Sequence, residues 1–148
     1  TKGEVGVGYE EFIKNITSNI KKFEFVTFDY GDRVPRNDFS TRIYEKHEVF
    51  PIFKENLELK KYFATTDITY DVYFSHIEDC FKELGISDIS FKTQMQALVE
   101  FGIIDLLEIL KENSDENRYL RESQKIKTLV EPTGMGDRFK MLHVKKYS

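Results

Sequence analysis

An apolar run at residues 24–31, with the sequence EFVTFDYG, stands out from the polar and mixed segments around it. Within it, residues 25–28 are all aromatic or β-branched. An apolar run of this length that ends in Asp-Tyr-Gly is typical of a strand buried on both faces. Open α/β sheets bind ligands at the carboxyl ends of their strands, so Asp29, Tyr30 and Gly31 are candidate site residues.

Apolar residues at every third or fourth position predict a helix before this strand, from Tyr9 to Phe23. The preceding GEVGVG follows no strand and lacks the spacing of a phosphate-binding loop, which favours a flexible lead-in. A second helix is predicted after residue 75. Ser75 and Glu78 have the spacing of a capping box at its start, and Gly85 is placed to end it.

Two longer apolar stripes predict further buried helices, at residues 95–110 with a bend near Gly102 and at residues 119–130, where Pro132 ends the pattern. Leu107 lies on the first stripe and is expected in the core. Weaker alternation predicts strands at residues 86–91 and 138–144. The chain of 148 residues is therefore expected to be one α/β domain with three strands and four or five helices.

The periodicity is lost between residues 32 and 66, where turn-forming residues precede a cluster of Arg42, Tyr44 and His47. Irregular segments of this length are usually lids or binding loops. We therefore interpret residues 32–66 as a substrate-binding lid. A surface insertion in which Arg42 only pairs with an acid is an equally compatible interpretation.

Composition excludes several classes of protein and of site. The net charge of -4 argues against non-specific nucleic-acid binding, and no apolar stretch is long enough to span a membrane. A single cysteine, Cys80, excludes an internal disulfide and fits a reducing, cytoplasmic setting. His76 and Cys80 stand one helical turn apart, but no second ligand pair is near in the sequence, so no metal site is predicted. The chain begins at Thr1, and we expect it to be a piece of a longer protein.

Five motifs in a fixed order resemble the C-terminal part of the MidA-like family of class I S-adenosylmethionine-dependent methyltransferases. They are FDYG at 28–31, TRIYEKH at 41–47, DITYDVYF at 67–74, the Thr93-Gln94 pair with LVEFGI at 98–103, and GMGDRFKML at 134–142. No single motif is specific, but their order and spacing together are. Mitochondrial members of this family methylate an arginine of a respiratory complex I subunit.

The resemblance implies the C-terminal half of a Rossmann-like methyltransferase sheet. Residues 24–30 would be its fifth strand, residues 86–91 its sixth, and residues 138–144 its seventh, inserted antiparallel between the other two. The Gly-rich first turn and the acidic ribose ligand, which make most of the S-adenosylmethionine site in such enzymes, do not occur in this sequence. The chain alone is therefore expected to be inactive, and the uncovered edge of the fifth strand makes a homodimer plausible.

Methyl transfer to a guanidinium nitrogen needs that nitrogen to be aligned and its charge to be tolerated or relieved, which carboxylates and phenols can do. The resemblance implies Asp29 and Tyr30 as catalytic residues. It implies a protein substrate bound by the following residues: Arg42, Tyr44, His47, Asp67 and Asp71. Asp29 and Asp67 could instead cap neighbouring backbone, which is commoner for a single Asp. The alternative function is a non-catalytic module that binds or assembles a partner protein through its aromatic-rich loop.

Overall fold

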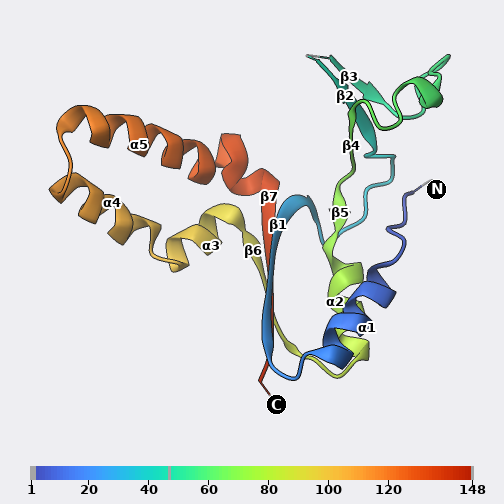
Figure 1. Cartoon of the computed structure of the whole chain (residues 1–148), viewed down its shortest axis with the longest axis horizontal. Coiled ribbons are helices and arrows are strands. Elements are labelled where there is room, and N and C mark those ends of the chain that lie inside the picture. The colour runs from blue at the N-terminus through green and yellow to red at the C-terminus, as the bar shows by residue number, and fades with distance from the viewer. Residues whose placement is uncertain (1–2, 47, 148) are drawn as a thin grey trace.

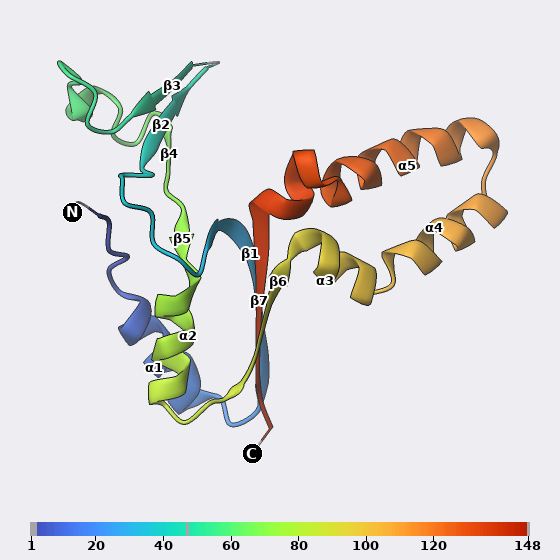
Figure 2. The same ribbon diagram turned by 180° about the vertical axis from the view of Figure 1, so that it is seen from behind.

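The computed structural model describes residues 3–46 and 48–147. Its main sheet has four strands in the order β5-β1-β7-β6, with helices on both sides (Figures 1 and 2). The bounds of these strands are Phe23–Asp32 for β1, Val72–Tyr73 for β5, Asp88–Thr93 for β6 and Phe139–Lys146 for β7. This is the α/β architecture, with a mixed sheet, that the sequence predicts.

β7 lies antiparallel between β1 and β6, which confirms the predicted strand order. Phe23 pairs with Lys146 and Tyr30 with Phe139, so the β1–β7 ladder runs along almost the whole of β1. β6 begins two residues later than predicted. The reason is that Ile86 is buried in the core, and pairing with β7 starts only at Asp88.

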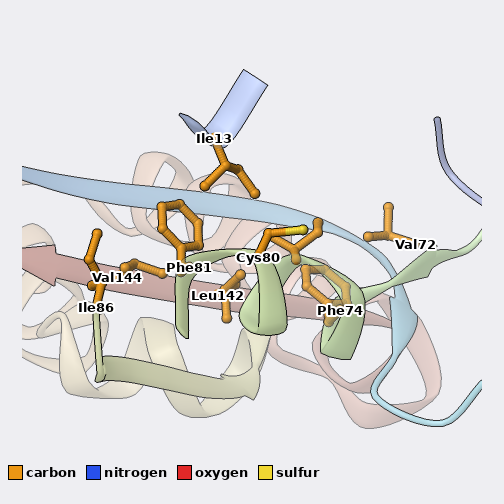
Figure 3. Close-up of a cluster of buried hydrophobic side chains, with 9 residues drawn as sticks. Ile13, Val72, Phe74, Cys80, Phe81, Ile86, Leu142 and Val144 are labelled. Carbon is orange, nitrogen blue, oxygen red and sulfur yellow. The ribbon is translucent and has the colours of Figure 1, made fainter. Parts of the chain in front are cut away.

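One face of the sheet is covered by α1 (Tyr9–Asn19) and α2 (Phe74–Glu83). Figure 3 shows the core between these helices and the sheet, where Ile13, Phe74, Phe81, Leu142 and Val144 are almost completely buried. Burying such side chains stabilises a fold by about 1.5–3 kcal/mol each relative to leaving them exposed. This cluster is therefore the main source of stability.

Two local predictions near this core are wrong. β1 is not buried on both faces: Glu24, Val26 and Asp29 are exposed. Nor does a capping box start α2, which begins at Phe74. Ser75 instead donates a hydrogen bond to the Arg33 carbonyl, and buried Glu78 pairs with the Arg33 guanidinium at 2.6 Å.

Residues 32–66, expected to be irregular, contain most of a second sheet with the order β3-β2-β4. Its strands are β2 (Arg42–Glu45), β3 (Glu48–Pro51) and β4 (Asp67–Thr69), and a short 3-10 helix, Leu59–Lys61, lies between β3 and β4. Strands of three or four residues are too short for an alternating pattern to show in the sequence. Figure 1 shows this small sheet beyond the carboxyl end of β1.

On the other side of the main sheet, three helices project away from it as an arm, residues 94–130 (Figures 1 and 2). They are α3 (Gln94–Glu100), α4 (Ile103–Glu112) and α5 (Glu116–Val130). The bend predicted near Gly102 is confirmed, because this residue has φ 85° and separates α3 from α4. The prediction that both apolar stripes are buried is wrong. No residue of α4 or α5 is buried, and Leu107 is half-buried.

A five-residue π-helical turn, η2 (Pro132–Gly136), leads from the arm back into β7. α5 ends two residues before Pro132, as the sequence predicts. Within residues 3–46 and 48–147, no helix is both long and apolar enough to cross a membrane.

Candidate functional site

The carboxyl end of β1 opens into a cavity of about 560 Å³ between the main sheet and the small one. Gly31 makes this junction possible. Its φ of 147° is unfavourable for other residues, and a Cβ there would collide with the backbone of Val72. β5 can therefore pair directly with the end of β1, which brings Asp71 and Tyr73 to the mouth of the cavity.

Asp71 is the centre of an ion-pair network in this cavity. Its carboxylate accepts from Arg42 Nη2 at 3.1 Å and from Arg36 Nη1 at 3.0 Å. Arg42 Nε donates to the Tyr44 hydroxyl at 2.8 Å. Burial alone would lower the pKa of Arg42, but the Tyr44 hydroxyl and the Asp71 charge outweigh it and raise the pKa, so the guanidinium stays charged.

Glu4 holds the adjacent wall in place. It accepts hydrogen bonds from the Ser40 backbone and hydroxyl at 2.7 and 2.6 Å and from the Thr41 backbone at 2.7 Å. Burial alone would raise the pKa of Glu4, but these hydrogen bonds lower the pKa to about 2. Ser40 Oγ also accepts from the Asp71 backbone N–H at 2.8 Å, so Glu4 is linked to the ion-pair network.

An aromatic floor is provided by Tyr30, whose ring lies 3.9 Å from that of Phe139 on the paired strand β7. The guanidinium carbons of Arg42 and Arg138 lie 5.9 and 5.6 Å from the centre of the Tyr30 ring. These distances are within the range of cation–π attraction. The Tyr30 ring therefore already accepts two cations, and their own side chains form part of the lining.

Asp32 and Asp137 are among the further carboxylates that line the same cavity. Asp32 accepts from the Arg33 backbone N–H at 2.7 Å, and Asp137 is approached by Lys140 only at its backbone carbonyl. Neither side chain forms an ion pair with any other residue that the structure describes. These carboxylates are available to a cationic ligand, whereas Asp71 already pairs with two arginines.

The structure brings together four of the predicted site residues: Tyr30, Arg42 and Asp71 line the cavity, and Tyr44 contacts Arg42. Arg42 does pair with an acid, as the alternative interpretation expected, but inside a cavity and with only 19% of its side chain exposed.

The other predicted residues lie elsewhere. Asp29 points away from Tyr30, as neighbours on a strand do, and lines a separate cavity of about 310 Å³. Its carboxylate accepts from the Tyr30 backbone N–H at 2.7 Å, the kind of local role that the sequence left open. Asp67 is exposed at the start of β4, and His47 lies outside the described residues.

Sequence reasoning missed Glu4, Arg36, Ser40 and Arg138. Glu4 lies in the segment expected to be a flexible lead-in, and its partner Ser40 is 36 residues away, so no local pattern reveals the contact. Arg138 could have been found from the sequence, because it is a charged residue within the motif GMGDRFKML.

A cluster outside this cavity brings donor atoms of Glu10, His76 and Cys80 within 4.8 Å of one another. His76 Nε2 lies 3.2 Å from the Glu10 carboxylate. Burial raises the pKa of the Cys80 thiol, and the Glu10 charge raises it further. A protonated thiol is a poor metal ligand, so this chemistry favours a Glu10–His76 pair beside a buried thiol.

Comparison with known proteins relates this chain to methyltransferase-like structures. No protein-family model and no curated protein matches the sequence. Two solved structures from Burkholderia thailandensis share its fold at 20% identity, with a TM-score of 0.76 and 92% of this chain covered. One is described as an uncharacterized ACR, COG1565 superfamily protein, and the other as a "COG1565 superfamily member and likely methyl transferase" bound to S-adenosyl-homocysteine. The chain spans only 36% and 35% of their lengths.

Proposed function

We propose that this chain is the acceptor-side, C-terminal part of an S-adenosylmethionine-dependent protein-arginine methyltransferase and is inactive alone. The observation that carries the proposal is the shared fold with a structure bound to S-adenosyl-homocysteine, of which this chain spans 35%. S-adenosyl-homocysteine is what remains of S-adenosylmethionine after it gives up its methyl group. The five sequence motifs support the finer assignment to the MidA-like family and to an arginine acceptor.

The uncovered edge of β1 is where the rest of such a sheet would pair. On that side, within residues 3–46 and 48–147, β1 is bonded only through Gly31 and Asp32, to β5. The neighbouring cavity is mainly apolar and includes Phe12, Ile13 and Val26, of which Phe12 and Val26 are about half exposed. A neighbouring parallel strand and its helix, supplied by the remainder of the longer protein, would cover these side chains.

The residues present do not fit the cofactor itself. A class I site needs a Gly-rich turn between strand and helix, where backbone N–H groups approach the ligand closely. The glycine at the end of β1 does not serve this purpose, because the space beside Gly31 is filled by Val72 of the same chain. Cofactor binding is therefore assigned to the remainder of the longer protein.

The cleft suits the arginine of a protein substrate. Asp32 and Asp137 would receive its guanidinium, since carboxylates have the charge that a guanidinium prefers. Tyr30, whose ring already accepts Arg42 and Arg138, would lie beside them. Asp71 would hold Arg42, which contacts Tyr44, as the wall of the cleft. His47 belongs to the predicted lid, residues 32–66, and Asp67 directly follows that lid in the sequence. Asp29, on the open-edge side, would face the half of the enzyme that binds the methyl donor.

Calorimetric titration of S-adenosylmethionine tests the proposal. We expect no binding by the 148-residue chain and binding by the longer protein, because the donor site is split from the acceptor side. Binding or methyl transfer by the chain alone would contradict the split. Binding by neither protein would contradict the enzyme assignment.

A non-catalytic assembly module is the second candidate. It is favoured by apolar side chains that are exposed on and around the small sheet, among them Val49, Phe53, Phe63 and Ile68. Such a surface is typical of protein contacts. In the calorimetric experiment this candidate predicts that neither protein binds S-adenosylmethionine.

A further inference from the structure

The helical arm carries large apolar side chains that nothing in the described part of the chain covers. Six of them have exposed fractions between 48 and 57%: Val99, Phe101, Ile104, Leu106, Ile109 and Leu120. Leu106 and Ile109 are three residues apart and lie on the same side of α4. Apolar patches of this kind on a soluble protein usually mark an interface.

The exposed side of α4 is distinct from the side that packs within the arm. Ile103, Leu107 and Leu110 recur at helical spacing and are half-buried, so they form the side that packs within the arm. Leu106 and Ile109 lie beside this stripe and stay exposed. One apolar side of α4 therefore packs within the arm, and the other apolar side has no partner among the described residues.

Charge identifies the second partner. α4 has three acidic residues and one basic residue, whereas α5 has four basic and two acidic residues. Among the described residues these opposite charges do not meet, because the ion pairs of α5 join Arg121 and Lys125 to Glu122 of the same helix. α4 and α5 are neighbours within the arm, yet no ion pair among the described residues joins them, so both helices keep charged groups for another partner.

We infer that the arm is the interface of a homodimer, in which α4 of each copy packs against α5 of the other. A two-fold axis makes every contact occur twice, so both acidic helices meet basic ones. Two such arms would form a helical bundle with the exposed apolar side chains inside. The helices contain 7, 10 and 15 residues, and only the outward side of each would contact the other copy.

Sedimentation of the 148-residue chain over a range of concentrations tests the dimer. We expect the wild type to dimerise and Leu106→Ser/Ile109→Ser to raise the dissociation constant of the dimer at least about tenfold, because buried apolar anchors dominate such interfaces. The control Leu84→Ser changes an exposed side chain at the end of α2 and should leave dimerisation unchanged. Unaltered circular dichroism shows that each variant folds.

A charge exchange tests which helices meet. Glu108→Lys/Glu112→Lys on α4 should weaken the dimer, and adding Arg118→Glu/Lys127→Glu on α5 should restore it. A monomeric wild type at every concentration would overturn the inference. So would a dimer that resists the arm variants but dissociates on Val26→Lys, since that residue lies on the open edge of β1.

Discussion

Single residues at the end of β1 decide the shape of the cleft. From the sequence, Tyr30, Arg42, Tyr44 and Asp71 could be predicted as neighbours, because the matched motifs place them in one region. Glu4 could not be predicted, since its contact with Ser40 depends on how the chain returns over 36 residues. Long-range hydrogen bonds of this kind leave no periodic signal in the sequence.

Glu4→Gln should make the chain less stable at neutral pH by about 1 kcal/mol, a value kept small because solvent screens this partly exposed carboxylate. The pKa of Glu4 is about 2 in the folded state against an ordinary 4.5, so its contribution is fully present above pH 4.5. It is lost as the pH falls from 4.5 through 2, because the unfolded state takes up its proton first.

Urea titrations of both proteins between pH 7 and pH 2 measure this effect. The two stability curves should converge at the acidic end. Glu55→Gln, at an exposed position in the loop after β3, serves as the control and should follow the wild type throughout. Equal stability of Glu4→Gln and wild type at pH 7 would mean that Glu4 does not hold the wall.

Asp29 and Asp32 lie on opposite sides of the strand end, so the proposed function predicts that their variants differ in kinetics in the longer methyltransferase that it assigns. Asp32→Asn should raise the KM for an arginine-containing peptide about tenfold, by removing a charged partner of the guanidinium. Asp29→Asn should lower kcat about 10- to 100-fold with little change in KM, because misplacement of reacting groups costs rate.

Steady-state kinetics distinguish these roles from a structural one. Asp79→Asn, at an exposed position on α2, is the matched control and should change neither constant. Lower melting temperatures with wild-type kinetics in both variants would show that the two carboxylates only cap neighbouring backbone.

At the scale of elements, long periodic segments could be predicted and short ones could not. The β1–β7–β6 order and helices α1, α2, α4 and α5 follow from patterns ten or more residues long or from the resemblance. The small sheet was missed because its strands have three or four residues and depend on pairing with one another. Burial of the arm was predicted wrongly, because an apolar stripe shows that a helix needs a partner but not that the same chain provides one.

Leu142→Ala should therefore cost about 2–5 kcal/mol of unfolding free energy, since this side chain is fully buried in β7. Leu107→Ala should cost less than half as much, because Leu107 is only half-buried between the helices of the arm. Urea denaturation at a concentration where the chain is monomeric compares the two. An equal loss would mean that the arm belongs to the same core as the sheet.

At the scale of the whole molecule, the side of β1 that faces away from β7 is largely unpaired among the described residues. The sequence resemblance predicted this edge, because it matched only the second half of a longer fold. Exposed edges of this kind readily pair with another strand. Along β1, every second backbone N–H points toward β7, and the others point toward the open side.

Hydrogen exchange should show this alternation directly. In the isolated chain, we expect β1 amides bonded to β7 to exchange slowly and the alternate amides between Glu24 and Tyr30 to exchange fast. In the longer protein both sets should be protected, because a neighbouring strand would cover the edge. Uniform protection in the isolated chain would place another partner on this edge.

The position of β7 between β1 and β6 has a consequence for synthesis on the ribosome. Glu24 on β1 contacts Tyr147, 123 residues later, so β1 has no antiparallel neighbour until nearly all of this chain has left the exit tunnel. Translation proceeds at about 5–20 residues per second, so the apolar side chains of β1 stay without this neighbour for several seconds. Folding is then limited by closing that long loop. A premature stop codon before β7 would leave β6 without a partner and β1 paired only at its end, with β5.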